Sequence, residues 1–523
     1  MISVSSRKVR LPGQILVGIL VLCFSLGYLQ TFAQAAPATA LAVPESTLLA
    51  PRATEAFYLD RQPGPAWQDD DLFDQLLTAL EGLRDHGLDP EHYHLATLRD
   101  LRNDRARRDR YATDAWFSAA AHMLYGKLDP VTVEPDWTAG SREADLNDSL
   151  LQALAAGEIA ASLTQFAPRQ PQYTSLVEHY RQLRQRELEP INTVPAGPTL
   201  RSGDYDDRVT VLQQHLDRLG TLDEDYQPGL MDAATVEAVK IFQAQNDLEP
   251  DGLVGPATLS ALNFGPQQKL DKLRVNLERW RWLPEELGQR HIRVNIAGFT
   301  VTTWENGSLL RTHLAVVGKD YRKTPVFSDQ IEYLIFNPWW EVPYSIARID
   351  KLPLFRQEPE LIRELGFEVL DRNGKALEPD TIDWNSVSQA NFPYRLRQAP
   401  GEENALGQVK IMFPNAHNVY LHDTPARGLF EQRQRAFSSG CIRTQFPLEL
   451  SRWLLEGNPG WDRERIDSVV ASGQETRVNL TTRVPIHILY HTTVSEPGGG
   501  VLFLDDIYQR DAAVLNGLLT PHH

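Results

Sequence analysis

The sequence predicts a multidomain α+β protein, and three observations along its 523 residues lead to that fold class. Apolar residues recur at helical spacing over 37–190. A linker rich in proline and glycine follows, and a compact unit of three short helices is expected at 198–264. From 291 onward the apolar period changes to two, which indicates β-strands. A chain of this length accommodates roughly three domains of about 150 residues each.

The region 37–190 is expected to be a helical scaffold. Two of its segments carry apolar residues on one helix face, at Leu72, Leu76, Leu77 and Leu80 and at Trp116, Ala120, Met123 and Leu124. The stretch 99–110 is dense in mixed charge and is expected to form an exposed face or loop. No constellation of catalytic side chains occurs in this region of the sequence.

The unit 198–264 is expected to contain three helices, with a tight turn before the last. The first two helices each carry an apolar face, at Val209, Leu212, Leu216 and Leu219 and at Val236, Val239 and Phe242. Asp232 is suited to cap the second helix, and Pro256 is suited to open the third. The residues 265–290, rich in arginine and tryptophan, are expected to form a helix that returns to the scaffold.

The remaining region, 291–523, is expected to be a mostly β domain. Alternating apolar residues begin at Ile292, and two further strands at 484–490 and 500–504 are expected to close the chain. Between about 345 and 397 the pattern becomes irregular and partly helical. This break predicts a cap inserted between strands of the β domain.

The N-terminus has the layout of a secretory signal over residues 1–36. A basic segment at 7–10 precedes an apolar run at 15–29, and small residues such as Ala35 and Ala36 follow. The apolar run of 15 residues is short for a membrane span, which needs roughly 20. The mature chain is therefore expected outside the cytoplasm without a membrane span, and an uncleaved anchor is the alternative.

Composition excludes several classes of partner. The net charge is −17, from 52 basic and 69 acidic residues, which argues against nucleic acid. The sequence contains no HExxH motif, no clustered histidines and cysteines, and no glycine-rich phosphate loop. No metal or other cofactor is therefore expected.

Cys441 is the most informative residue of the chain. It would be the only cysteine left after removal of 1–36, because Cys23 lies inside that segment. A single cysteine forms no internal disulfide, so it is a candidate reactive thiol. His422, 19 positions earlier, ends a predicted strand and could deprotonate the thiol. The alternative is a buried, inert cysteine and a surface histidine.

The residues next to Cys441 could supply the other requirements of acyl transfer. The amides of Gly440, Cys441 and Ile442 are candidate donors to an oxyanion, and glycine allows a carbonyl to approach closely. Arg443 could fix the loop or attract a substrate carboxylate. These residue types form a set suited to thioester chemistry.

Two stretches of the β domain, 420–425 and 436–443, resemble the catalytic signature of the L,D-transpeptidases. Further likeness comes from 316–326, 337–343 and 392–398, and the unit 198–264 resembles peptidoglycan-binding-like domains. The chain as a whole resembles the large periplasmic subfamily, which has a helical scaffold and a capped catalytic domain. Many members have histidine before the motif glycine, but this chain has Ser439, so either a side chain or a backbone carbonyl could orient His422.

The resemblance implies a cysteine-dependent transpeptidase of peptidoglycan. Cys441 would be acylated by the third residue of a tetrapeptide stem, with His422 as base and then acid. Transfer to the amine of a second stem would create a diaminopimelate–diaminopimelate cross-link. The resemblance also implies roles for residues around the nucleophile, with Gly440, Ser439 and Arg443 in the oxyanion loop and Tyr420, Trp339, Trp340 and Tyr344 at the substrate.

Three alternatives remain open on the sequence. They are an L,D-carboxypeptidase or related thiol hydrolase, a non-catalytic wall-binding scaffold, and transfer to a lysine of an attached protein. Peptidoglycan stem peptides are the expected partners, other wall synthases are candidates, and carbapenems are expected to acylate the cysteine. Glycan binding by 198–264 is left open.

Overall fold

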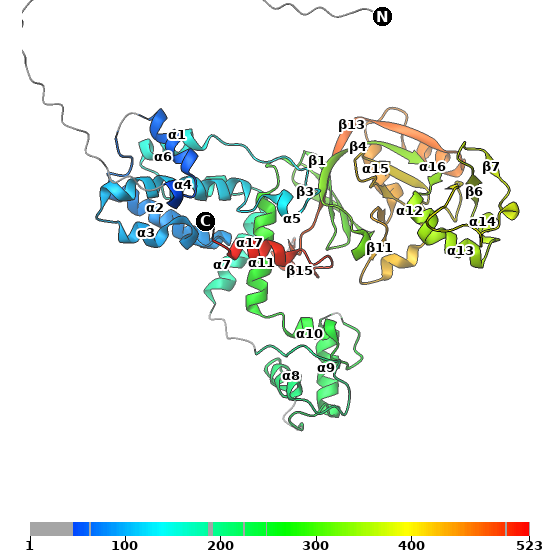
Figure 1. The fold of residues 1–523 in the computed structure, drawn as a ribbon, viewed down its shortest axis with the longest axis horizontal. Helices are drawn as coiled ribbons and strands as arrows, with labels where there is room; N and C mark the ends of the chain where they lie inside the picture. Colours follow the sequence, from blue (N-terminus) through cyan, green and yellow to red (C-terminus); the bar gives the residue numbers. More distant parts are fainter. Residues whose placement is uncertain are drawn as a thin grey trace, which may run out of the picture. The chain divides into compact units, whose positions relative to one another are not determined.

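The computed structural model describes residues 45–61, 64–186, 192–222, 225–246, 248–496 and 499–521. Its element order confirms the expected multidomain α+β class, with helices up to residue 281 and mainly strands after it (Figure 1). The expected signal segment 1–36 lies outside the described residues. Across the described ranges, no helix is both long and apolar enough to cross a membrane.

The N-terminal region is helical and is organised around the long helix α4, Arg105–Tyr125. The other α-helices are α1 (Pro51–Asp60), α2 (Asp70–Gly82), α3 (Leu95–Asp100), α5 (Pro130–Val133), α6 (Leu146–Ala156) and α7 (Pro171–Gln185). The apolar faces expected on α2 and α4 enter one core, which buries Leu76, Leu80, Trp116 and Met123.

The expectation of an exposed segment at 99–110 is wrong for two of its residues. Arg108 and Asp109 belong to α4 and are only 1% and 6% exposed. Asp109 accepts hydrogen bonds from the Tyr58 hydroxyl at 2.5 Å and the Trp67 amide at 2.7 Å. Arg108 pairs with Asp70 at 2.6 Å. These partners offset the free-energy cost of burying the two charges, and they come from positions distant in the sequence.

The small unit contains three helices: α8 (Asp207–Arg218), α9 (Ala233–Gln245) and α10 (Pro256–Leu262). Asp232 caps α9 by accepting a hydrogen bond from the Thr235 amide at 2.8 Å. Gln243 fixes the turn before α10, since its side chain bonds the Gly252 amide and the Leu253 carbonyl, each at 2.9 Å. The unit has its own apolar core. The expectation that Leu219 belongs to it is wrong, because Leu219 follows the last residue of α8 and is 54% exposed.

Helix α11, Pro266–Arg281, contacts α7 and α4 of the helical region. The chain ends in a further helix, α17 (Asp511–Leu519), which contacts α11. The expectation that strands close the chain is therefore wrong. Val514 and Leu518 of α17 are buried in the core of the helical region, so this short helix is stabilised by tertiary packing.

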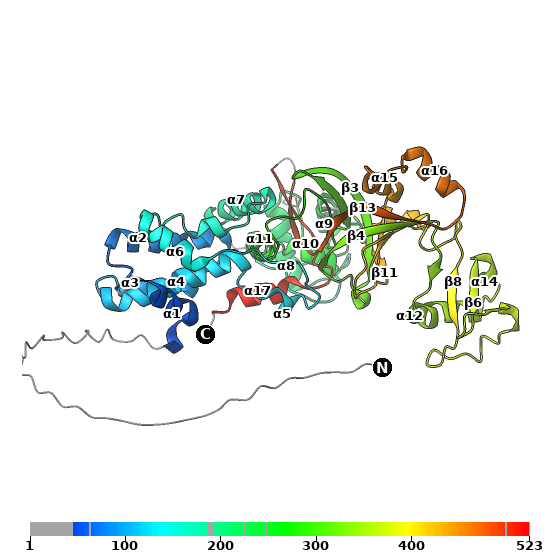
Figure 2. The ribbon, with the colours of Figure 1, turned by 90° about the horizontal axis from the view of Figure 1, so that it is seen from above.

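The β domain is a nine-stranded sheet within the described residues, in the order β11-β3-β12-β10-β9-β4-β13-β1-β2. A further pairing of β2 with β3 closes the sheet on itself. The strands are β1 (Arg290–Asn295), β2 (Thr300–Glu305), β3 (Ser308–Gly318), β4 (Phe327–Phe336), β9 (Val409–Met412), β10 (Leu421–His422), β11 (Ala436–Ser438), β12 (Ile442–Thr444) and β13 (Thr476–Leu489). Figure 2 shows β4 beside the long strand β13.

Three smaller elements complete the β domain. After β12 come α15 (Pro447–Leu455) and α16 (Arg463–Ala471), and β14 (Thr493–Ser495) pairs with β15 (Val501–Phe503) as a separate hairpin. Inward-facing apolar residues of the sheet form one core with α15, and Ile292, Ile411 and Leu450 are among its fully buried members.

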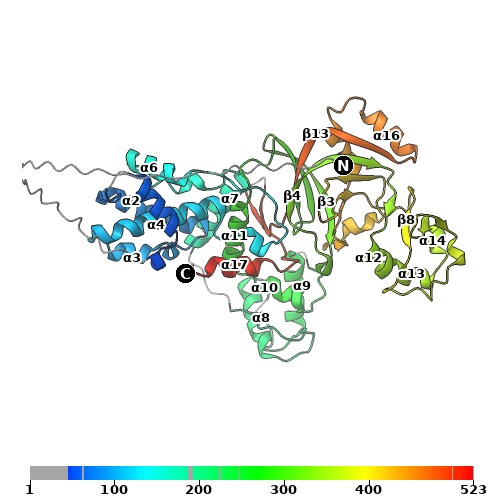
Figure 3. The ribbon, with the colours of Figure 1, turned by 45° about the horizontal axis from the view of Figure 1, so that its top comes forward.

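The cap is inserted between β4 and β9. It is a four-stranded sheet in the order β5-β8-β6-β7, from β5 (Trp340–Glu341), β8 (Arg395–Gln398), β6 (Phe367–Leu370) and β7 (Ala376–Leu377). Its helices α12 (Tyr344–Ile346), α13 (Leu352–Gln357) and α14 (Leu361–Glu364) lie together, and a π-helical turn, Ala347–Lys351, joins the first two (Figure 3). Edge-to-face contacts of Phe355 with Phe367 and Trp384 form its aromatic centre.

Candidate active site

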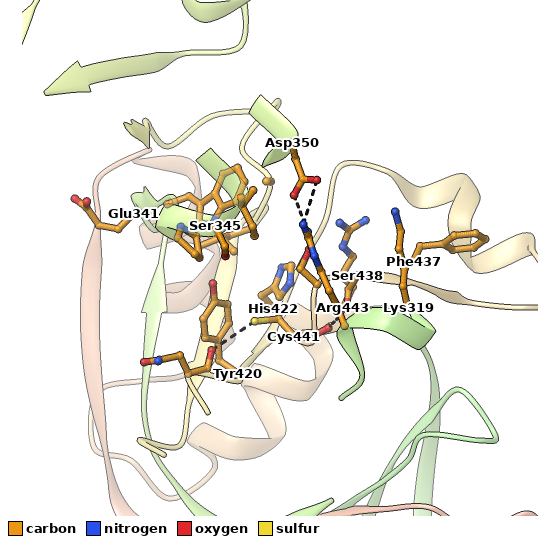
Figure 4. A pocket seen from close by; sticks show the side chains of 18 of the residues that line it. Lys319, Glu341, Ser345, Asp350, Tyr420, His422, Phe437, Ser438, Cys441 and Arg443 are labelled. Atoms are coloured by element: carbon orange, nitrogen blue, oxygen red, sulfur yellow. Dashed lines mark hydrogen bonds and ion pairs between the residues drawn. The ribbon is translucent and has the colours of Figure 1, made fainter. Parts of the chain in front are cut away.

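Cys441 and His422 lie at one cavity of about 1090 Å³. The cavity is lined by the β domain and by cap residues that include Ser345 and Lys351. Figure 4 shows Tyr420, His422 and Cys441 close together at this cavity. A cavity with a nucleophile and a base meets the first geometric requirement of an active site.

Strand pairing explains why residues 19 positions apart meet. β10 and β12 run parallel as neighbours, with Leu421 opposite Ile442 and His422 opposite Arg443. Cys441 immediately precedes β12, so it lies at the start of the strand that pairs with β10, and β10 ends at His422. Both side chains are therefore held by a rigid sheet, although the loop between them is long.

His422 is held in one orientation by a backbone carbonyl. Its Nδ1–H donates to the carbonyl oxygen of Asp423 at 2.5 Å, which leaves Nε2 as the acceptor. Burial, with a further contribution from Arg443, lowers the pKa of His422 to about 3. The imidazole is therefore neutral at physiological pH and can accept a proton.

Asp423 has a structural role in this arrangement. Its carboxylate accepts hydrogen bonds from the Gln408 and Thr424 amides at 2.8 and 2.7 Å and pairs with Arg427 at 2.7 Å. The side chain thus points away from the imidazole, and the residue contributes its carbonyl to His422. The sequence could not distinguish these two roles.

The thiol of Cys441 is held in its neutral form. Burial raises the pKa of Cys441, and this outweighs the opposing effects of Tyr420, which hydrogen-bonds the sulfur, and of Lys410 and Arg443. The sulfur also lies 3.6 Å from the carbonyl oxygen of Asn418. The thiolate is therefore formed only when a base removes the proton.

This predicts how Cys441 responds to pH. Alkylation by iodoacetamide is expected to be slow near neutrality and to rise up to about pH 10, because the raised pKa leaves little thiolate at lower pH. The measurement is the alkylation rate by intact-protein mass spectrometry, with Cys441→Ala as the blank for labelling at Cys23. A rate that is already maximal near pH 6 would contradict the raised pKa.

The loop at Cys441 leaves the backbone amide of Cys441 open. The Gly440 amide donates to Ser438 Oγ at 3.1 Å, and the Ile442 amide donates to the Tyr420 carbonyl at 3.1 Å. Among the described residues, no hydrogen bond engages the Cys441 amide. Gly440 has φ +114°, a conformation that favours glycine. The Cys441 amide is thus the donor available to an oxyanion.

Two residues hold this loop: Thr324, from the stretch 316–326 that carried part of the resemblance, and Tyr508, which no motif singled out. Thr324 Oγ1 donates to the Gly440 carbonyl at 2.9 Å and accepts from the Gly318 amide at 2.9 Å. The Tyr508 hydroxyl donates to the Gly318 carbonyl at 2.6 Å. A Cβ at Gly318 would lie 2.1 Å from the Arg322 carbonyl oxygen, so only glycine fits. The C-terminal segment thereby supports the catalytic loop.

Replacing Thr324 with valine is expected to lower kcat about tenfold or more with little change in KM, because a small displacement of the nucleophile is costly. Thr324→Ser retains the hydroxyl and is expected to keep most of the activity. Thr312→Val, on an exposed part of β3, is the matched control. Steady-state kinetics on a tetrapeptide stem provides the measurement, and an unchanged kcat in Thr324→Val would refute this positioning role.

The aromatic residues expected at the substrate divide into two groups. Trp340 and Tyr420 line the cavity, whereas Trp339 and Tyr344 are not among its lining residues. Arg397 stacks over the Trp339 ring at 4.4 Å, and the Tyr344 ring contacts Phe392 edge-on. Ser439 also lines the cavity, and its hydroxyl accepts a hydrogen bond from Arg322 at 2.8 Å.

Comparison with known families assigns three parts of the chain. The L,D-transpeptidase catalytic domain matches residues 289–466, a scaffold domain matches 52–179, and a domain described as "Putative peptidoglycan binding domain" matches 205–262. Three separate segments of the chain therefore match an L,D-transpeptidase catalytic domain, a peptidoglycan-binding-type domain and a scaffold domain. This confirms the resemblance seen in the sequence.

A Haemophilus influenzae protein named "Putative L,D-transpeptidase" is 35% identical over 243 residues. The match covers 46% of this chain and 48% of that protein, so the chain spans about half the length of this relative. Solved structures of L,D-transpeptidases from Mycobacterium smegmatis and Xylanimonas cellulosilytica are 13% and 14% identical, with TM-scores of 0.17 and 0.16. They cover 38% and 58% of this chain, and 58% and 100% of their own chains.

Proposed function

We propose that this chain is a cysteine-dependent L,D-transpeptidase that cross-links peptidoglycan stems. The observation that carries the proposal is that His422 ends β10 and Cys441 directly precedes the neighbouring parallel strand β12, with both residues at one cavity. The neutral imidazole, oriented by the Asp423 carbonyl, has the free nitrogen that a general base needs. The catalytic-domain match of 289–466 includes both residues.

The first half-reaction forms a thioester. The Cys441 sulfur attacks the carbonyl at the L-centre of the third stem residue while His422 Nε2 takes the thiol proton. The Cys441 amide stabilises the oxyanion of the tetrahedral intermediate. Collapse of this intermediate breaks the C–N bond, and protonated His422 returns the proton to the departing amine of D-alanine.

The second half-reaction transfers the acyl group to an amine. The side-chain amine of a second stem attacks the thioester carbonyl, and His422 removes a proton from that amine. Collapse of the second tetrahedral intermediate breaks the C–S bond, and the proton returns to the Cys441 sulfur. The product is an amide between two diaminopimelate residues, and the enzyme regains its resting thiol.

The same proposal places the protein outside the cytoplasm. Its substrate is the cell wall, and the N-terminal residues 1–36 have the layout of an export signal. The match of 205–262 to a peptidoglycan-binding domain supports a wall substrate. We propose a periplasmic protein with stem peptides as substrates and other wall synthases as candidate partners.

Mass spectrometry of the protein and its products tests the proposal. The mature chain is incubated with a disaccharide carrying a tetrapeptide stem, beside Cys441→Ala. A dimer that is one D-alanine lighter than two substrates is expected, and it should be absent from the variant. A tripeptide monomer alone would instead identify a carboxypeptidase, and the absence of any product would favour a non-catalytic wall-binding protein.

A further inference from the structure

The cavity at Cys441 is lined by more cations than anions. Its basic lining residues are Lys319, Arg322, Lys323, Lys351, Lys410 and Arg443. Its acidic lining residues are Glu341 and Asp350. This excess stands out because the chain as a whole has a net charge of −17. The cavity therefore attracts anionic groups of a substrate.

Both acidic residues of the cavity are already paired. Asp350 pairs with Arg322 at 2.6 Å, and Glu341 pairs with Arg395 at 3.2 Å. Among the described residues, no carboxylate lies within 4.0 Å of the charged groups of Lys351, Lys410 or Arg443. These three cations are called the cationic cluster below.

Each member of the cationic cluster is partly removed from water. The Lys410 ammonium lies 3.9 Å from the Tyr420 ring centre, and the Lys351 ammonium lies 5.0 Å from that of Phe367. Arg443 Nε is buried and has no hydrogen-bond partner. Burial lowers the pKa of all three groups. Half-buried cations without partners cost free energy that a bound anion would recover.

The cationic cluster surrounds the reacting atoms. Lys410 lies opposite His422 in the pairing of β9 with β10, and Arg443 lies opposite His422 on β12. Lys410 and Arg443 both act electrostatically on the Cys441 sulfur. Lys351 reaches the same place from the cap and is close enough to Arg443 for their charges to repel. An anion bound here would lie next to the scissile bond.

The proposed reaction brings two similar groups to this place in turn. The leaving group, D-alanine, is an amine with a carboxylate on the carbon that bears the nitrogen. The attacking group, the side-chain amine of diaminopimelate, also has a carboxylate on the carbon that bears its nitrogen. Water, the competing acceptor, carries no carboxylate. One anion site could therefore recognise both amines and disfavour hydrolysis.

We propose that Lys351, Lys410 and Arg443 form a carboxylate site that binds first the terminal carboxylate of the leaving D-alanine and then the carboxylate beside the acceptor amine. This inference rests on the proposed transpeptidase function. It assigns to Lys410, and to Lys351 of the cap, a role in selecting an α-amino acid amine over water.

The test compares two donors that differ only at the terminal carboxylate. One tetrapeptide stem ends in D-alanine and the other in D-alanine amide, and release of the terminal residue gives kcat/KM. The unmodified enzyme is expected to favour the acid about tenfold or more, as for a hydrogen-bonded charge pair. In Lys410→Met and Lys351→Met this preference should fall to about twofold, because the acid loses an interaction that the amide does not make.

The amide donor is the internal reference, because a general loss of activity in either variant lowers both rates and cancels in their ratio. Lys375→Met removes an exposed cap lysine away from the cavity and should keep the full preference. A second measurement is the ratio of dimer to hydrolysed monomer, which should fall in Lys410→Met. Equal rates on both donors, or a preference that survives both substitutions, would overturn the carboxylate site. Absence of release from either donor by the unmodified enzyme would refute the transpeptidase function itself.

Discussion

Replacement of Cys441 by alanine is expected to lower turnover by at least about four orders of magnitude, because removal of a nucleophile leaves only binding and oxyanion stabilisation. The fold should persist, since the sulfur is half-buried and its hydrogen bond to the Asn418 carbonyl is long, at 3.6 Å. Turnover on a tetrapeptide stem and the thermal midpoint together check this prediction.

An acyl-enzyme adduct provides the independent readout for Cys441. A carbapenem is expected to add its mass to the unmodified chain and not to Cys441→Ala, because the thioester requires the sulfur. Cys441→Ser is the conservative comparison, with a much poorer nucleophile in the same loop. Substantial turnover by Cys441→Ala with an unchanged thermal midpoint would show that the cysteine is inert.

The candidate residues Cys441 and His422 could be proposed from sequence because the signal of each is local. Cys441 lies in a short stretch of small residues, and His422 ends a run of strand-forming residues. Likewise, the interruption of the two-residue period located the cap, because a break in periodicity needs no knowledge of tertiary contacts. These features are encoded within a few residues of one another.

The support of the site could not be predicted in this way. Tyr508 reaches Gly318 from 190 positions away, and Thr324 reaches Gly440 from 116 positions away. No spacing rule connects such pairs, since only the strand order of the closed sheet brings them together. Helix α17 is a similar case, because its two buried residues gain their partners from the helical region at the other end of the chain.

The burial of charged residues could not be predicted for the same reason. The mixed-charge stretch at 99–110 resembles a solvated surface until the partners of Arg108 and Asp109 are known. The choice between a side chain and a carbonyl as the partner of His422 also depended on three dimensions. There, the contacts of Asp423 with Arg427 and two backbone amides decide the orientation.

Replacement of His422 by glutamine is expected to slow acylation by about 10² to 10⁴-fold near neutral pH, because the buried thiol of Cys441 then has no base. The deficit should shrink as the pH rises towards about 10, since hydroxide then forms the thiolate directly. Single-turnover acylation followed by mass spectrometry across this range gives the measurement. Thr312→Val, on the exposed part of β3, is the control.

For the unmodified enzyme, the acylation rate is expected to persist at acid pH. Because the pKa of His422 is lowered from 6.5 to about 3, the imidazole keeps its role as base when an ordinary histidine would be protonated. Acylation should therefore not decline with an apparent pKa near 6.5.

The unfolded chain does take up that proton, so stability conferred above pH 6.5 is lost progressively as the pH falls towards 3. The acylation rate must therefore be measured in a single turnover directly after the protein is moved to acid pH, before it can unfold. A fall in the single-turnover rate with a midpoint near pH 6.5, while the protein stays folded, would contradict this prediction. It would mean that His422 is exposed to water in the working enzyme, so that burial by the cap and sheet does not set its pKa.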